Sequence, residues 1–420
     1  MTTRITNWAG NITFSTERLH RPASVPQLQQ VVASSGRVRA LGSGHSFSPV
    51  ADTTGDLVSV AGLPRLIEID AAQGTVTVSA GLRYGEIAAP LHAAGRALAN
   101  LGSLPHISVA GACATGTHGS GDANTSLAAA VCAMEMVSAA GDLVTLTRQT
   151  ANFAGAVVAL GSLGVVTRLT LETVPAFQMR QYVYDNIPLE QLSRHFEQIV
   201  SAAYSVSLFT TWRGPVIDMA WLKCRADAAT CPAEPEWMGG KLADGPRHPV
   251  PGMPAETCTA QLGAIGPWYE RLPHFRLDFT PSSSAELQSE YLVPRTSGLD
   301  ALSALDTIAE RLAPVVQISE IRTVARDALW LSPAYQRDCV AFHFTWIQDY
   351  PAVAPVLAAV EELLEPYGAR PHWGKLFSMS PEKVRGQYEH ADDFRQLMRH
   401  HDPAGKFRNQ FLDRYLPVLP

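Results

Sequence analysis

The stretch Arg37–Pro49, RVRALGSGHSFSP, restricts most strongly what this chain can fold into. Val38–Leu41 predicts a short strand, and Gly42–Gly44 then forces a tight turn with few side-chain atoms. Consecutive backbone N–H groups in such a turn suit an anionic diphosphate. His45 follows at once, which places an imidazole at the edge of the predicted cradle. Taken alone, a glycine turn is most often only a turn, and a lone histidine is usually structural.

A second stretch, Gly102–Gly121, is rich in small residues and almost free of charge. Small residues are needed where the backbone must approach a flat ring or a phosphate, although the same composition also suits a buried, tightly turned loop. The sequence has no GxxxxGK[ST] pattern, and no GxGxxG opens a helix after the first strand. The two stretches therefore indicate a large cofactor that is bound without either common nucleotide fingerprint.

Charge and cysteine content exclude several classes of protein. The formal net charge is −6 with both signs interspersed, which argues against nucleic acid and membrane partners. Met1–Ala40 has no signal pattern, and no apolar run approaches membrane-spanning length. The six cysteines show no CxxC pair and no zinc spacing, so we expect no metal and favour free buried thiols over disulfides. We predict a cytoplasmic protein and, without a sustained heptad or apolar stripe, a monomer.

Hydrophobic patterning predicts an α+β protein whose residue pattern changes near Pro175, which we take as a domain boundary. Before that point we expect helices at Pro22–Ser34 and Tyr84–Ala94, and strands at Leu57–Val60, Leu66–Asp70, Thr75–Ala80 and Val165–Glu172. We also expect a hairpin that joins Val131–Ala139 to Leu143–Leu146. After it we expect helices at Asp300–Ala313 and Ala354–Glu365, and strands at Glu320–Val324 and Cys339–Ile347. The late turn DPAGK, from Asp402 to Lys406, suggests a segment that returns to the first part.

Four segments carry a resemblance to one family: GSGHS, SLPHISVAGACATGTHGSG, GSLGVVT and DPAGKFRNQF. Together they resemble the vanillyl-alcohol-oxidase class of FAD flavoproteins. Within that class the chain is most similar to the bacterial alditol (xylitol/sorbitol) oxidases, from Asn7 to its C-terminus. The resemblance implies a two-part FAD-binding domain at residues 1–177, to which a segment of about 372–420 returns. It also implies an α/β substrate-binding cap domain at residues 178–371.

The resemblance also implies roles for individual residues. His45 matches the histidine that binds the flavin 8-methyl group covalently, beside a diphosphate loop made by Leu41, Gly42, Ser43, Gly44, Ser46 and Phe47. Further expected flavin contacts are Gly102, Ser103, Ser108, Gly111, Ala112, Thr115, Thr117, His118, Gly119, Ser120, Val165, Val166 and His372. Expected substrate contacts are Ser103, Glu320, Arg322, Thr345 and Lys375.

Strand periodicity agrees with the substrate assignments. Glu320 and Arg322 lie two residues apart and therefore share one face of a strand, as His343 and Thr345 do on another. Charged residues in apolar strands are costly unless they are paired or functional, so an exposed face or a structural ion pair is the competing interpretation. Donors and acceptors spaced along a pocket suit the row of hydroxyls of an uncharged polyol.

The expected reaction is FAD-dependent oxidation of an alditol's terminal primary alcohol to the aldose, with O2 reduced to hydrogen peroxide. Arg322 and Lys375 would stabilise the developing alkoxide. The base stays open between His343, which could also be a core histidine, and a Lys375 kept neutral by Arg322. Gly102 has no Cβ, which suggests an open path for oxygen. Alternatives are an aldonolactone oxidase, a dehydrogenase and a non-catalytic flavin-binding module, the last disfavoured by the polar cluster.

Overall fold

The computed structural model describes residues 4–279 and 285–418, and its N-terminal part contains three small sheets. The first is parallel, in the order β1-β3-β2, with β1 at Leu19–His20, β3 at Asp56–Val58 and β2 at Val38–Ala40. The second is antiparallel, in the order β4-β5-β9-β7-β8, with strands at Ile67–Asp70, Thr75–Ser79, Val165–Glu172, Val131–Val137 and Leu143–Thr147. A two-stranded sheet pairs β6, Arg96–Ala97, with β10, Val174–Pro175. The predicted strands and the hairpin are confirmed.

Four helices pack around these sheets: α1 (Val25–Ser34), α2 (Tyr84–Ala93), α3 (Val109–Ala114) and α4 (Phe153–Val157). α1 begins where Ser24 accepts a hydrogen bond from the Gln27 amide, with a proline in its first turn. It buries Leu28 and Val32 beneath the parallel sheet in a cluster that also contains Phe407 from the far end of the chain. Both predicted helices of this part are confirmed, and α2 ends before Gly95, whose φ is +71°.

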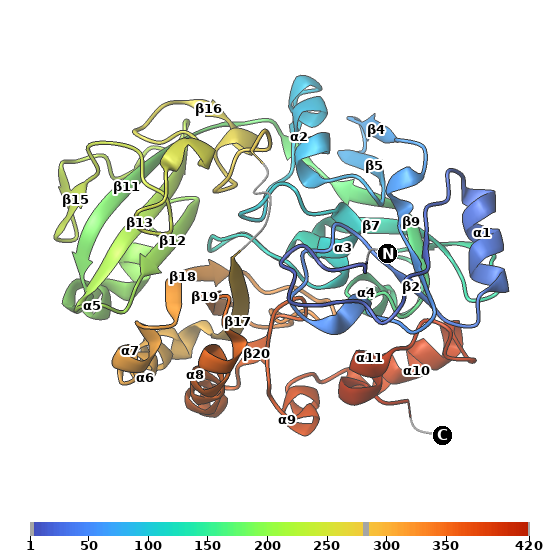
Figure 1. The fold of residues 1–420 in the computed structure, drawn as a ribbon. Helices are drawn as coiled ribbons and strands as arrows, with labels where there is room; N and C mark the ends of the chain where they lie inside the picture. The colour runs from blue at the N-terminus through green and yellow to red at the C-terminus, as the bar shows by residue number, and fades with distance from the viewer. Residues whose placement is uncertain (1–3, 280–284, 419–420) are drawn as a thin grey trace.

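A ten-stranded antiparallel sheet dominates the rest of the chain, in the order β14-β15-β11-β13-β12-β18-β19-β17-β20, with β16 beside β11 (Figure 1). Its long strands are β11 (Gln178–Pro188), β12 (Ser205–Thr210), β13 (Val216–Arg225), β17 (Glu286–Pro294), β18 (Val316–Val324) and β19 (Cys339–Ile347). Its short strands are β14 (Glu236–Trp237), β15 (Gly240–Leu242), β16 (Gly266–Pro267) and β20 (Arg370–Pro371). The strands expected at Glu320 and Cys339 are confirmed.

Helices cover one face of this sheet and leave the other face to a cavity. α5 (Leu189–Val200) packs on β11 and β12, while α6 (Gly298–Asp306) and α8 (Tyr350–Leu364) pack on β17. The helix predicted over Asp300–Ala313 is wrong in one respect: it is two helices, α6 and α7 (Ala309–Leu312), separated by a turn at Thr307 and Ile308. The apolar period continues through that turn, so periodicity alone does not reveal the break.

The C-terminal segment returns to the N-terminal part, and Figure 1 shows its red helices beneath the blue strands. These helices are α9 (Pro381–Gly386), α10 (Ala391–His401) and α11 (Gln410–Tyr415). In the loop between α10 and α11, Lys406 O accepts a hydrogen bond from the Val38 amide at 2.9 Å. Phe407 O accepts one from the Arg39 side chain at 2.7 Å. Asn409 Nδ2 donates to the carbonyls of three residues just after the His45 turn, Pro49, Val50 and Asp52.

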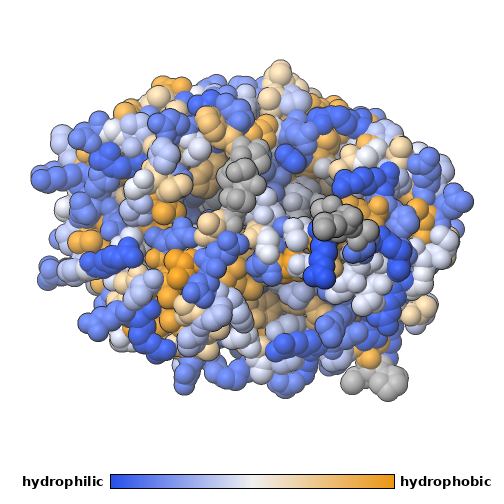
Figure 2. Space-filling model, viewed as in Figure 1, coloured by the Kyte–Doolittle hydropathy of each residue, from blue (hydrophilic) through white to orange (hydrophobic). Residues whose placement is uncertain are grey.

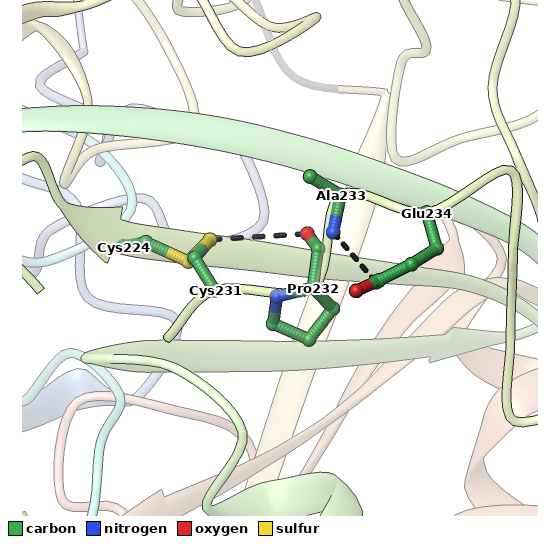
Figure 3. Close-up of a disulfide and its surroundings, with 5 residues drawn as sticks. All are labelled: Cys224, Cys231, Pro232, Ala233 and Glu234. Carbon is green, nitrogen blue, oxygen red and sulfur yellow. Dashed lines mark hydrogen bonds between the residues drawn. A yellow bond between two sulfur atoms is a disulfide. The ribbon is translucent and has the colours of Figure 1, made fainter. Parts of the chain in front are cut away.

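The cysteines correct the expectation of free thiols. Cys224, near the end of β13, forms a disulfide with Cys231 in the following loop (Figure 3). Cys113, Cys258 and Cys339 are free and buried, and Cys132 is free and partly buried. The loop after β13 turns straight back on its own strand, a local geometry that cysteine spacing does not signal.

The surface in Figure 2 is mainly hydrophilic, with small apolar patches between charged side chains. Among residues 4–279 and 285–418, no helix has the length and hydropathy needed to cross a bilayer.

Candidate active site

A cavity of about 740 Å³ lies between the polar face of the large sheet and the loops of the N-terminal part. Cofactor and small-molecule sites typically measure about 300–1,000 Å³, so the space suits a large cofactor. The loop after β2, the Gly102–His118 segment and strands β17, β18 and β19 all contribute to its lining. The structure therefore brings together segments that lie up to three hundred residues apart in sequence.

Nearly all the predicted site residues line this cavity: Leu41, Gly42, Ser43, Gly44, His45, Ser46, Phe47, Gly102, Ser103, Ser108, Gly111, Ala112, Thr115, Thr117, His118, Val166, His372, Glu320, Arg322, His343, Thr345 and Lys375. Three do not. Val165 lies in the apolar cluster under α1, Ser120 donates to Val206 O, and a Cβ on Gly119 would lie 2.3 Å from Leu101 O. These three residues support the cavity loops from behind.

The Gly42–Gly44 turn and the start of α3, at Ser108–Gly111, form one joint cradle. The Ser108 amide donates to Ser43 Oγ at 3.1 Å, and the Ser43 amide donates to Ser108 Oγ at 3.3 Å. A Cβ on Gly42 would lie 2.4 Å from Ser108 Oγ, and one on Gly111 would lie 2.6 Å from it. Gly44 has a φ of +73°, which favours glycine. The two interlocked segments lack a Cβ at Gly42, Gly44 and Gly111, which fits the close approach of a diphosphate, as FAD requires.

His45 lies at the end of this cradle and is held from one side. Its ring stacks on Trp8 with a centroid distance of 4.9 Å, and the Trp8 amide donates to Gly44 O at 2.8 Å. Burial, together with the charges of His106, Arg83 and Lys375, lowers the pKa of His45 to about 4. Within the described residues its buried Nδ1 has no hydrogen-bond partner. His45 is therefore a neutral imidazole with an unsatisfied nitrogen in the cavity wall.

On the opposite wall, three strands bring a buried ionic cluster together. The register places Glu320 of β18 beside His343 of β19, and His343 beside Glu290 of β17. Arg322 pairs with Glu290, and its Nε lies 3.6 Å from Glu320 Oε1. Glu290 also lies 3.3 Å from His118 Nε2 and 3.7 Å from His343 Nδ1. Alternate residues of paired strands share one face, so the sheet itself assembles this cluster.

Burial and charge set the protonation of the cluster. Burial opposes ionisation of Glu320 and Glu290, but the Arg322 guanidinium and the neighbouring histidines together outweigh it, so the pKa of both carboxyls lies well below the usual range. Burial lowers the pKa of His343 to about 4, with a further contribution from Lys375. Near neutral pH the wall therefore combines two carboxylates and a guanidinium with a neutral imidazole.

Lys375 joins the two walls. It follows β20, its amide donates to His372 O at 3.0 Å, and its ammonium binds Gln288 of β17. The same ammonium lies 5.6 Å from the centre of the Phe47 ring, in the loop that carries His45. Burial lowers the pKa of Lys375 to about 8, although Glu290 opposes the shift. Thr345 pairs with Gln288 across β19 and β17, and its Oγ1 lies 3.3 Å from His343 Nε2.

Sequence reasoning missed several cavity residues, among them Glu290, Gln288 and His274. Glu290 and Gln288 belong to the strand ELQSEYLVP, whose polar residues recur at period two. The argument applied to Glu320 and Arg322 would have found them. The third residue, His274, donates to Glu320 from an irregular segment and has no sequence signal.

The arrangement suits oxidation of an alcohol. Two cations, Arg322 and Lys375, meet near a neutral imidazole that can accept a proton, and carboxylate and hydroxyl acceptors continue along the same wall. The opposite wall consists of backbone turns and small side chains that fit FAD. When bound, FAD supplies hydride acceptance from the alcohol carbon.

Comparisons with known proteins agree with this geometry. Residues 17–147 match a family model described as an FAD binding domain, and residues 282–415 match one described as D-arabinono-1,4-lactone oxidase. An alditol oxidase from Streptomyces sp. is 51% identical over 98% of this chain and 99% of its own length. An L-gulono-1,4-lactone dehydrogenase from Mycobacterium tuberculosis is 29% identical over 98% of each chain.

The solved structures show the same fold. A cholesterol oxidase from B. sterolicum superposes with a TM-score of 0.80, covering 99% of this chain and 96% of that one, at 15% sequence identity. With FAD as its cofactor and the fold of the vanillyl-alcohol-oxidase class, this chain belongs to the alditol oxidase family.

Proposed function

We propose that this protein is an FAD-dependent oxidase that converts the terminal primary alcohol of alditols such as xylitol and sorbitol to the aldose and reduces O2 to hydrogen peroxide. The observation that carries the proposal is the buried row of Glu320, Arg322, His343 and Thr345 on one face of paired strands, completed by Lys375. A row of alternating donors and acceptors suits the hydroxyls of an uncharged polyol. The Streptomyces relative named alditol oxidase supports the same substrate class.

In the proposed reaction, Arg322 and Lys375 bind the reacting oxygen and stabilise its negative charge. The neutral His343 accepts the hydroxyl proton at a ring nitrogen. Lys375 is the second candidate for that proton, because its pKa of about 8 leaves part of it neutral near pH 7. Glu320 accepts hydrogen bonds from the remaining hydroxyls, Thr345 accepts and donates them, and Ser103 does both from the opposite wall. His372 and His118 would support the flavin ring from the same side as Lys375.

We further propose that FAD is bound covalently through His45. Its neutral ring and unsatisfied Nδ1 support this assignment. The yellow colour should stay with the polypeptide after acid precipitation, whereas the colour of a His45→Ala protein should enter the supernatant. Complete release of flavin from the wild-type protein would contradict the assignment.

The aldonolactone alternative rests on the match of residues 282–415 to a lactone oxidase model. A panel of xylitol, sorbitol, mannitol, glycerol and gulonolactone separates the possibilities. We expect oxygen consumption and stoichiometric peroxide with the alditols and little with the lactone. Turnover of the lactone alone, or turnover only with an artificial electron acceptor, would identify a lactone oxidase or a dehydrogenase instead.

The domain division, location and oligomeric state stay proposals. Strand pairing supports an FAD-binding domain at residues 1–177 with a returning segment of about 372–420, because all strands of the large sheet lie within Gln178–Pro371. A monomeric, cytoplasmic protein follows from the sequence, but a disulfide such as Cys224–Cys231 is more typical of oxidising compartments. Thiol alkylation of protein from freshly lysed cells, followed by mass spectrometry, tests the state of this pair.

A further inference from the structure

The segment Arg271–Phe275 crosses from one wall of the cavity to the other. Its His274 amide donates to Ser103 O at 2.9 Å, which fixes it to the Gly102–His118 wall. Its His274 ring reaches β18, where Nε2 lies 2.8 Å from Glu320 Oε1. Both side chains are only 6% exposed, so bulk water does not compete for this bond. One short segment thus connects the flavin-side backbone with a substrate-side carboxylate.

The protonation of this pair is determined by its surroundings. Glu320 is ionised, so its oxygens accept hydrogen bonds, and the contacting nitrogen must carry the hydrogen. Burial lowers the pKa of His274 to about 4, so the ring is neutral and has one N–H, at Nε2. The ring is also packed edge-on against Trp221 and Phe209, at centroid distances of 5.1 and 5.6 Å. His274 is therefore a fixed donor to a single oxygen of Glu320.

Fixing one oxygen leaves the other available. Within the described residues, His274 makes the one hydrogen bond to the Glu320 side chain, and Oε2 accepts none. Glu320 lines the cavity, where a bound polyol presents hydroxyl donors. Without the His274 donor the carboxylate would be free to turn towards Arg322, whose Nε lies 3.6 Å from Oε1.

The segment is held in place by a buried lysine that the proposed chemistry does not use. Lys223 of β13 is 1% exposed, and its ammonium donates to three consecutive carbonyls, Arg271 O, Leu272 O and Pro273 O, at 2.7, 2.8 and 2.9 Å. Burying an ammonium is costly unless its donors are satisfied, and here all three N–H groups have partners. These carbonyls immediately precede His274, so Lys223 fixes the backbone that presents the imidazole.

We propose that His274 is a positioning residue for polyol binding, which orients Glu320 so that its Oε2 accepts a substrate hydroxyl. Lys223 keeps His274 in position by binding the Arg271–Pro273 carbonyls. This inference rests on the proposed alditol oxidation, because Glu320 is assigned there to bind substrate hydroxyls. It adds two residues, from β13 and from an irregular segment, that lie behind the substrate contacts.

The test compares His274→Phe with His274→Gln, whose amide nitrogen has a reach similar to that of Nε2. A hydrogen bond to a charged group is worth roughly a tenfold change or more, so His274→Phe should raise KM for xylitol at least about tenfold and change kcat less than about threefold. His274→Gln should restore KM to within about threefold of wild type. Lys223→Met should raise KM in the same way, and Lys223→Arg should recover most of the loss.

Two further measurements separate positioning from general destabilisation. Hydrogen–deuterium exchange of the peptide containing Arg271–Phe275 should accelerate in Lys223→Met and not in the control Tyr291→Phe. Tyr291 is buried in β17 and donates to Glu361 on the helix-covered side of the sheet, so its loss should lower the Tm without changing KM.

An unchanged KM in His274→Phe, or an equal loss in His274→Phe and His274→Gln, would overturn the inference while the wild-type enzyme still oxidised alditols. A wild-type enzyme that consumed no oxygen with any alditol would instead overturn the proposed function, and with it the substrate assigned to Glu320.

Discussion

The two walls of the cavity recognise their ligands by opposite means. The wall made by the Gly42–Gly44 turn and the start of α3 has mainly small side chains and backbone amides. The sheet wall instead holds Arg322 among Glu290 and Glu320. A larger side chain should therefore impair ligand binding by the first wall, and removal of a charged group should impair the function of the second. A cofactor of constant shape is suited to a close-fitting cradle, and a reaction that develops charge is suited to preorganised ions.

The largest effect should come from removing the central charge of the sheet wall. Arg322→Met leaves the Glu290 and Glu320 carboxylates without their guanidinium, so the free energy of unfolding should fall by about 3–5 kcal/mol. The rate constant kcat should fall by about 10²–10³-fold, as for loss of a donor to a developing oxyanion. Urea unfolding and steady-state oxygen consumption measure the two effects. Arg322→Lys, which keeps the charge, should lose less of both, and equal losses would show that charge is not the cause.

An added methyl group tests the cradle wall. In Gly42→Ala the new Cβ meets Ser108 Oγ at 2.4 Å, and Ser108 cannot move without breaking its bonds with Ser43. Overpacking typically costs about 1–3 kcal/mol, so FAD affinity should fall about tenfold or more, measured as flavin content after purification. Gly36→Ala is the matched control, because its Cβ would meet nothing within 4 Å. Full flavin content in Gly42→Ala would show that the cradle is not tightly packed.

The pH dependence of kcat/KM distinguishes the two bases of the sheet wall. A base must be unprotonated to act, so a His343 base with a pKa of about 4 loses activity only as the pH falls through that value. A Lys375 base would gain activity up to its pKa of about 8. We expect His343 to be the base, and therefore less than a twofold change in kcat/KM between about pH 6 and pH 8. A rise of about tenfold per pH unit over that range would assign the proton to Lys375.

The smallest effect should come from a second glycine of the cradle wall. Gly102→Ala would place its Cβ 3.5 Å from Ile107, an ordinary contact, so the protein should fold and bind FAD normally. If oxygen reaches the flavin through this opening, reoxidation in stopped flow should slow by a few-fold, while reduction by xylitol stays constant. An unchanged rate of flavin reoxidation would show that oxygen does not pass Gly102. Of the two glycines tested, only Gly42 would then be sensitive to an added methyl group.

The sequence predicted those parts of the molecule whose signal is local. β9 and β19 have the predicted bounds because the residues of β9 alternate and those of β19 are mostly apolar, with turn residues on either side. The family resemblance identifies Glu320 and Arg322, and their period of two places both on one strand face. The roles assigned to all site residues stay predictions. Local pattern does not show which strands become neighbours, so the pairing of Arg322 with Glu290 was not foreseen. The His274 contact and the Cys224–Cys231 disulfide depend on irregular segments and were missed for that reason.

The return of the C-terminal segment has a consequence for biosynthesis. Arg39, next to the cradle, is buried and donates to carbonyls of Val50, Leu160, Gly161 and Phe407. The Phe407 carbonyl lies 368 residues after Arg39 in the chain, so it is synthesised much later. Until then the guanidinium lacks one of its acceptors, and Pro49–Asp52 lacks the Asn409 amide that fastens it. Flavin capture should therefore follow the synthesis of the segment that contains Phe407 and Asn409.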